Sequence, residues 1–365
     1  MSGGVLPSQA IRALVERRAV ATDAPLAEGQ IQPASLDLRL GATAYRIPAS
    51  FLPGAGATVQ ERLRDFSMHE IDLTGGACLE TGCVYLVPLQ ERVALPEGLE
   101  AAANAKSSTG RLDVFTRLIG DSSTEFDRLE PGYEGPLWAE ISPRTFSVLA
   151  RPGARLNQLR FRDGDAAIRG EALDALHAEE GLVRIDGEAP AALDLVEGGV
   201  AFSVDLARRE SPVGWRARRH APLIDLDGIG AHDPKDYWEP LEVDRHGRLI
   251  LDPGAFYILA SREAVHVPPG CAAEMTPYSA LVGEFRVHYA GFFDPGFGHA
   301  ATGGHGARGV LEVRCHETPF ALQHGQVVGR LVYERMGDVP DILYGQGGLG
   351  SNYQGQGLKL SKHFR

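Results

Sequence analysis

The chain carries the stretch CVYLVPLQERVALPEGLEAAANAKSS at residues 83–108 and a second version of it, AFYILASREAVHVPPGCAAEMTPYSA, at residues 255–280. The two versions align without a gap at a constant offset of 172 residues, so that Tyr85 corresponds to Tyr257. Self-similarity at a fixed offset is typical of a structural unit that occurs more than once. The sequence therefore predicts an internal duplication.

The repeat continues beyond these stretches. LEPGYEGPLWAE at residues 129–140 is echoed by FDPGFG and GVLEV at residues 293–298 and 309–313. The second copy is eight residues shorter before its Pro-Gly turn, and the offset of 172 then returns, so that Glu140 corresponds to Glu312. We expect two domains, residues 1–195 and residues 196–365.

Each copy has the pattern of an all-β unit. Short apolar runs such as VYLVPL, FYILA and VLEVRC alternate or are rich in β-branched residues, and Pro and Gly separate them. This pattern is typical of a β-barrel or β-sandwich. Short helices are expected from Ser8 to Arg17 and at residues 171–180, the second as a solvated spacer between the copies. The predicted fold class is mainly β with a few short helices.

Composition limits the possible partners. The chain has 365 residues, 44% of them hydrophobic, a net charge of −12 and a pI near 5.5. An acidic chain is a poor nonspecific binder of nucleic acid, and no apolar run reaches the about 18 residues of a membrane span. The N-terminus lacks a secretory signal pattern, and four cysteines are too few for a disulfide scaffold. We expect a cytoplasmic protein that binds neither nucleic acid nor membrane.

The strongest local motif is AKSSTGRLD at residues 105–113. It places Lys106, Ser107, Ser108 and Arg111 within six residues. Two hydroxyls, two cations and the neighbouring backbone N–H groups suit a polyphosphate, whose oxygens accept several charge-assisted hydrogen bonds. The alternative interpretation is a solvated turn. No fixed spacing of histidines or cysteines indicates a metal site.

Five elements in order resemble the deoxycytidine triphosphate (dCTP) deaminases, which share the fold of the trimeric deoxyuridine triphosphatases (dUTPases). They are IQPASLDLRLG, AKSSTGR, DRLEPGYEGPLWAE, RPGARLNQLRF and the tail YGQGGLGSNYQGQGLKLSKHF. The resemblance covers nearly the whole chain. It implies two tandem dUTPase-like distorted β-barrels of the jelly-roll type.

The resemblance also implies roles for individual residues. Family members deaminate cytosine without zinc, and a glutamate takes a proton from the water that attacks C4. Here that glutamate is Glu140, within the apolar segment PLWAEI. Arg128 and Glu130 would orient the base, the water and the deoxyribose. The implied phosphate-binding residues are Lys106, Ser107, Ser108 and Arg111, and the implied residues of a C-terminal lid are Tyr344, Tyr353 and Gln356.

The sequence departs from the family pattern in both copies. Lys106 replaces an arginine, and Glu130 replaces an aspartate. The second copy keeps Asp294 and Glu312, but it has lost the phosphate-binding cations, with Tyr278, Ala280, Gly283 and Phe292 at the positions of Lys106, Ser108, Arg111 and Arg128. Because the resemblance implies sites that lie between subunits, Glu140, Glu312 or both could serve a complete site. We favour Glu140, which Arg128 accompanies.

The expected function is metal-independent hydrolysis of dCTP to dUTP and ammonia, which supplies dUTP for dTMP synthesis in pyrimidine deoxyribonucleotide biosynthesis. Mg²⁺ is expected only as a companion of the triphosphate. One alternative is a dUTP diphosphatase or a bifunctional dCTP deaminase and dUTPase. A second alternative is a non-catalytic nucleotide-binding regulator. We expect a homo-oligomer, for which trimers and even-numbered assemblies are equally plausible.

Overall fold

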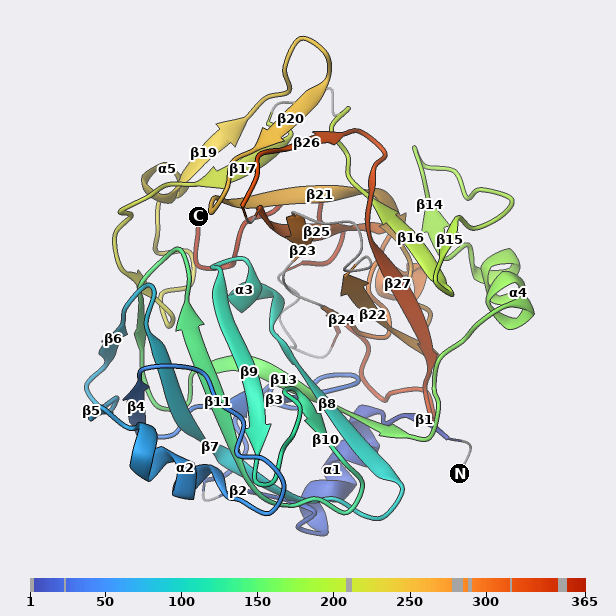
Figure 1. Cartoon of the computed structure of the whole chain (residues 1–365). Helices are drawn as coiled ribbons and strands as arrows, with labels where there is room; N and C mark the ends of the chain where they lie inside the picture. The colour runs from blue at the N-terminus through green and yellow to red at the C-terminus, as the bar shows by residue number, and fades with distance from the viewer. Residues whose placement is uncertain are drawn as a thin grey trace. The chain divides into compact units, whose positions relative to one another are not determined.

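The computed structural model describes residues 3–22, 24–207, 212–277, 285–287, 291–315, 317–346 and 353–365. The chain divides into two compact units (Figure 1). The first unit contains residues 1–166 together with the later segments 220–233 and 361–365, and the second contains residues 167–219 and 234–360. Both units are built mainly from β-strands, as the sequence predicts. No described helix is long and apolar enough to cross a membrane.

The main segment of the first unit ends at Ala166, whereas the sequence placed the domain boundary near residue 195. The segment after it is part of the second unit and is no solvated spacer, because helix α4 (Glu171–Glu180) buries Leu173 in the core of that unit. Leu182 and Val183 join the same core. The sequence did not predict the buried face of α4, because the charged residues on its other face indicated a solvated helix.

Two large sheets and one small sheet form the first unit. One large sheet has the order β1 (Gly4–Val5), β13 (Arg155–Asp163), β8 (Leu99–Ala105), β10 (Arg128–Leu129), and β3 (Leu36–Arg39) also pairs with β13. The other has the order β5 (His69–Asp72), β4 (Thr43–Ile47), β7 (Val84–Ala94), β11 (Glu134–Pro143), β9 (Val114–Gly120), with β2 (Val20–Thr22) on β7. The small sheet is β18 (Ile224–Asp225), β12 (Val148–Ala150) and β6 (Ala77–Leu79). The helices are α1 (Ser8–Glu16), α2 (Val59–Phe66) and α3 (Ser107–Gly110).

The second unit repeats this plan. One sheet has the order β19 (Trp238–Leu241), β17 (Gly214–Ala217), β21 (Phe256–Val265), β25 (Ala307–Cys315), β23 (Phe285–Val287), with β14 (Val183–Arg184) on β21. The other has the order β15 (Leu195–Val196), β16 (Gly199–Ser203), β27 (Val327–Arg335), β22 (Cys271–Pro277), β24 (Phe292–Phe293). A two-stranded sheet pairs β20 (Arg248–Leu251) with β26 (Phe320–Gln323). The helical elements that the structure describes in this unit besides α4 are α5 (Pro234–Tyr237) and η2 (Ala300–Thr302).

Strand register confirms the duplication. In the first unit Glu140 on β11 lies opposite Leu86 on β7. In the second unit Glu312 on β25 lies opposite Ile258 on β21. Both residues of the second pair follow those of the first at the offset of 172 found in the sequence. The two copies therefore share their strand pairing as well as their sequence pattern.

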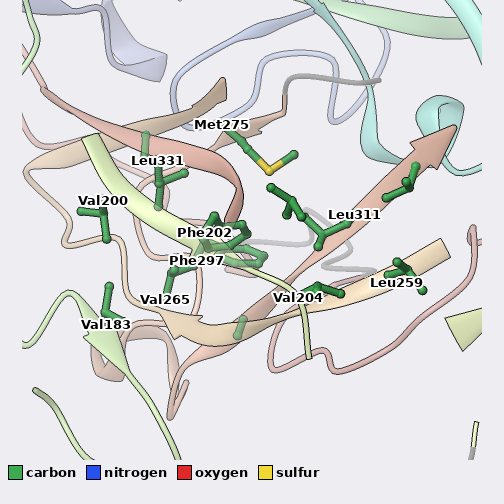
Figure 2. Packing of buried hydrophobic residues seen from close by; sticks show 14 of the residues in the cluster. Val183, Val200, Phe202, Val204, Leu259, Val265, Met275, Phe297, Leu311 and Leu331 are labelled. Carbon is green, nitrogen blue, oxygen red and sulfur yellow. The ribbon is translucent and has the colours of Figure 1, made fainter. Parts of the chain in front are cut away.

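The core of the second unit fills the space between its two large sheets (Figure 2). Phe202 of β16, Leu259 of β21, Leu311 of β25 and Leu331 of β27 are fully buried in it. Gly309 on β25 makes room for the largest of these side chains, because a Cβ at that position would lie 2.2 Å from the Phe202 ring. Two sheets closed on one shared apolar core are the β-barrel or sandwich arrangement that the sequence predicts.

Candidate active site

The LEPGYEG motif forms the turn that leads into strand β11. Gly132 has φ +78°, a conformation that favours glycine. The Tyr133 hydroxyl accepts a hydrogen bond from the Asp121 N–H at 3.0 Å and donates one to the Pro136 carbonyl at 2.7 Å. A Cβ on Gly135 would lie 2.7 Å from that hydroxyl. The Pro-Gly-aromatic-x-Gly spacing thus builds a rigid entry to the strand that carries Glu140.

Glu140 is buried in the middle of β11, with only 2% of its surface exposed. Arg117 lies directly opposite on β9. Its Nε donates to Glu140 Oε1 at 3.0 Å, and its Nη2 donates to the same oxygen. Oε2 is buried and accepts no hydrogen bond from the residues that the structure describes. A buried polar atom without a partner costs about 1–3 kcal/mol, so this oxygen is a prime position for a ligand or a water.

The AKSSTGR motif folds into α3, with Lys106 at its N-cap. Ser108 and Arg111 are buried, which contradicts the alternative of a fully solvated turn. Lys106 forms an ion pair with Asp37 of β3, a carboxylate that is itself buried. Arg155 Nη1 lies 3.5 Å from the other oxygen of Asp37. Two cations therefore share one carboxylate beside the motif.

The end of the chain packs against this motif. The Ser361 hydroxyl donates to the Ser108 carbonyl at 2.8 Å and shares a hydrogen bond of 2.9 Å with His363 Nδ1. Burial lowers the pKa of the Lys362 ammonium, and the positive charge of Lys106 nearby lowers it further. A third cation therefore lies close to Lys106 and Arg155. The tail that resembles the family's C-terminal lid contains Ser361 and Lys362, but the sequence singled out neither of them.

Arg128 and Glu130 form an ion pair with a 3.1 Å separation between Arg128 Nε and Glu130 Oε1. The Arg128 side chain is about half exposed, and its Nη2 also lies 3.4 Å from Glu100 Oε2. It belongs to β10 of the five-stranded sheet, whereas Glu140 belongs to β11 of the six-stranded sheet. Within the first unit the described arginine that contacts Glu140 is thus Arg117, and the roles of Arg128 and Glu130 in orienting the nucleotide stay predictions.

Both acidic residues of the second copy are buried. Glu312 is 4% exposed on β25, and Asp294 is 7% exposed. The Asp294 carbonyl accepts a hydrogen bond of 3.0 Å from Phe297, which closes the second Pro-Gly turn. The positions of Tyr278, Ala280 and Gly283, which correspond to the phosphate motif, lie outside the described residues.

The three expected lid residues pack within the second unit. The Tyr344 N–H donates to the Pro295 carbonyl at 2.8 Å, and the Tyr344 ring lies 5.5 Å from that of Phe297. Tyr353 is part of the apolar core. Gln356 exchanges two hydrogen bonds of 3.0 Å with Arg308 on β25. These residues belong to the second unit, while the described tail residue that contacts the phosphate motif of the first unit is Ser361.

Acid should loosen the terminal segment through His363. Burial lowers the pKa of His363 to about 4, from 6.5 in an exposed histidine. Because the folded-state pKa is depressed, the stabilisation is present above pH 6.5 and is lost as the pH falls toward 4, by up to about 3 kcal/mol. We expect the melting temperatures of the wild type and of His363→Gln to converge as the pH falls through this window. Parallel curves in a calorimetric pH series would contradict this expectation.

Comparisons with known proteins agree with the repeat. The family model described as the 2'-deoxycytidine 5'-triphosphate deaminase (DCD) N-terminal domain matches residues 2–165, and the model of the C-terminal domain matches residues 169–364. The chain belongs to the dCTP deaminase family. The two matches of this dCTP deaminase family meet near Ala166, where the main segment of the first compact unit ends.

Individual members of the dCTP deaminase family are also similar to this chain. The crystal structure of 2'-deoxycytidine 5'-triphosphate deaminase from Agrobacterium tumefaciens is 53% identical, with a TM-score of 0.86 over 93% of this chain and 100% of that one. A dCTP deaminase from Haloarcula marismortui is 33% identical over 37% of this chain and 67% of its own length. A "dCTP deaminase, dUMP-forming" from Coprothermobacter proteolyticus is 31% identical over 43% of this chain and 81% of its own length. Each match covers a larger share of the relative than of this chain, so these two relatives are shorter chains.

Proposed function

We propose that this protein hydrolytically deaminates dCTP to dUTP and ammonia. The observation that carries the proposal is Glu140, a buried carboxylate whose Oε2 has no hydrogen-bond partner among the described residues. A carboxylate in such a position can accept a proton from a bound water and pass it on without losing it to solvent. Membership of the dCTP deaminase family supports this reaction over others that a buried glutamate could serve.

The reaction balances with one glutamate. Glu140 takes a proton from water, and the resulting hydroxide forms a bond to C4 of cytosine. Glu140 passes this proton to N3, where it remains as the N3–H of uracil. It then takes the second proton from the hydroxyl on C4 and gives it to the exocyclic amine, the C4–N bond breaks as the C4 carbonyl forms, and ammonia leaves, so that dCTP and water give dUTP and ammonia. Glu140 ends in its starting state.

We propose that the triphosphate binds at the motif on α3. Lys106, Ser107, Ser108 and Arg111 supply two cations and two hydroxyls, and Lys362 adds a third positive charge close to Lys106. Since Lys106 is paired with Asp37 in the structure, a bound phosphate would compete with that carboxylate for the ammonium. Mg²⁺ would enter with the nucleotide and neutralise part of its charge.

A second candidate function is a bifunctional enzyme that also releases pyrophosphate. It is favoured by the relatives whose names state that they are dUMP-forming, from Coprothermobacter proteolyticus and Beutenbergia cavernae, at 31% and 32% identity. Formation of dUMP requires hydrolysis of the triphosphate in addition to deamination.

Separate assays of the two products test both candidates. We expect ammonia from dCTP in stoichiometric yield with dUTP. Pyrophosphate released along with that ammonia would indicate the bifunctional enzyme. Pyrophosphate from dUTP without ammonia from dCTP would indicate a diphosphatase and overturn the proposal. Nucleotide binding without either product would favour the non-catalytic regulator.

We also propose that the protein acts in the cytoplasm as a homo-oligomer. Its four cysteines are free thiols, which suits a reducing compartment. The oligomer is supported by the resemblance to enzymes whose sites lie between subunits. Light scattering checks it, since a particle of 39.2 kDa, the mass of one chain, would exclude an oligomer.

A further inference from the structure

Several contacts besides the ion pair with Glu140 hold the side chain of Arg117 in place. Its Nη2 donates to the Ser50 hydroxyl at 2.6 Å in addition to Glu140. Its guanidinium lies 3.5 Å from the centre of the Phe126 ring and 4.8 Å from that of Phe115. Contacts with two aromatic rings and a hydroxyl fix both the position and the plane of the guanidinium.

In the described part of the chain, the Arg117 guanidinium donates hydrogen bonds to only one of the two carboxylate oxygens of Glu140. Both Nε and Nη2 donate to Oε1, so the usual arrangement in which an arginine binds both carboxylate oxygens is not formed. A partial rotation of the carboxylate would weaken both hydrogen bonds, so they hold its plane. The contacts therefore fix one oxygen and leave the other, Oε2 in the structure, available.

A second buried arginine–glutamate pair in the same unit shows the contrast. Arg39 Nε donates to Glu91 Oε1 at 2.7 Å, and that oxygen also accepts from Gln30 Nε2 at 2.7 Å. The other oxygen, Oε2, accepts from the Arg39 backbone N–H at 2.8 Å. Both oxygens of Glu91 are thus satisfied, as expected for a pair that only supports the fold. Glu91 and Glu140 are both buried, and each forms an ion pair with an arginine. They differ in that Oε2 of Glu140 has no hydrogen-bond partner among the described residues.

We propose that Arg117 is a positioning residue for the deamination: it fixes Oε1 of Glu140 and thereby points Oε2 at the water and the leaving amine. This inference rests on the proposed function of Glu140. Arg117 touches no reacting atom itself. Its contribution lies in orientation, and the effect of orientation on a proton transfer is felt in the rate of the chemical step rather than in the binding of nucleotide.

The test compares matched lysine substitutions in the two pairs. In Arg117→Lys we expect kcat for dCTP to fall about 100-fold, with KM nearly unchanged, because a single ammonium cannot fix the carboxylate plane. In Arg39→Lys we expect a lower melting temperature but an unchanged kcat for the folded enzyme. Equal loss of kcat in both variants would show that the effect is general destabilisation and would overturn the proposal.

Chemical rescue provides an independent readout. Arg117→Ala leaves a space between Phe115 and Phe126 that suits a free guanidinium ion, so millimolar guanidinium should raise its kcat several-fold, well below denaturing concentrations. The same addition should not change the kcat of Arg39→Lys. Unchanged kcat in both Arg117 variants would overturn the proposal while the function stands, provided that the wild type releases ammonia and Glu140→Gln does not. A wild type that releases no ammonia would instead refute the proposed function itself.

Discussion

Glu140→Gln is expected to reduce the release of ammonia from dCTP by a factor of about 1000 or more, while the affinity for dCTP changes only a few-fold. The amide has nearly the shape of the carboxylate, but it cannot accept a proton from water at neutral pH, and positioned acid–base groups contribute about 10²–10⁴-fold to a rate. Because Glu140 is 2% exposed on a central strand, bulk solvent is a poor substitute for it. An ammonia assay measures the rate, and calorimetric titration measures the affinity.

The natural control is Glu312→Gln. Glu312 occupies the same place in the second copy, is buried to a similar extent and lies opposite Ile258 as Glu140 lies opposite Leu86. We expect this variant to keep the wild-type rate, which would assign the chemistry to the first copy. Loss of activity in Glu312→Gln with an active Glu140→Gln would move the reaction to the second copy.

The sequence predicted the fold well because the same strand pattern occurs in both copies of the repeat. Apolar alternation placed the strands, and the offset of 172 reappears in the strand register. The sequence did not predict the pairing of strands that lie far apart along the chain. Strand β18 runs parallel to β12, although Ile224 follows Val148 by many residues, and the end of the chain joins the first unit. Short strands of two residues carry no alternation by which to recognise them.

The candidate site was predicted only where one motif contains it. Glu140 and the motif around Ser108 were found because their neighbours in sequence are also their neighbours in space. Arg117 was missed, because in VFTRLIG it looks like an ordinary outward-facing strand residue, and its partner becomes visible only in the pairing of β9 with β11. Asp37 was missed as a partner of Lys106 for the same reason.

Lys106→Ala is expected to weaken the binding of dCTP about 10- to 100-fold and to leave the binding of deoxycytidine, which has no phosphates, nearly unchanged. A hydrogen bond to a charged group contributes about 1.5–3 kcal/mol, and only the triphosphate can receive it from this ammonium. Direct titration of the two ligands into the same preparation measures the difference.

Lys106 also neutralises Asp37, so its removal has a structural cost that must be separated from the phosphate effect. Asp37 would keep Arg155, at 3.5 Å, and the nearby charge of Lys362, yet loss of one partner of a buried ion pair destabilises a protein by about 3–5 kcal/mol. The double variant Lys106→Ala/Asp37→Asn removes the uncompensated charge. It should recover much of the lost melting temperature and none of the lost triphosphate affinity. If the double variant binds dCTP as the wild type does, or if Lys106→Ala weakens dCTP and deoxycytidine equally, Lys106 serves the fold and not the phosphates.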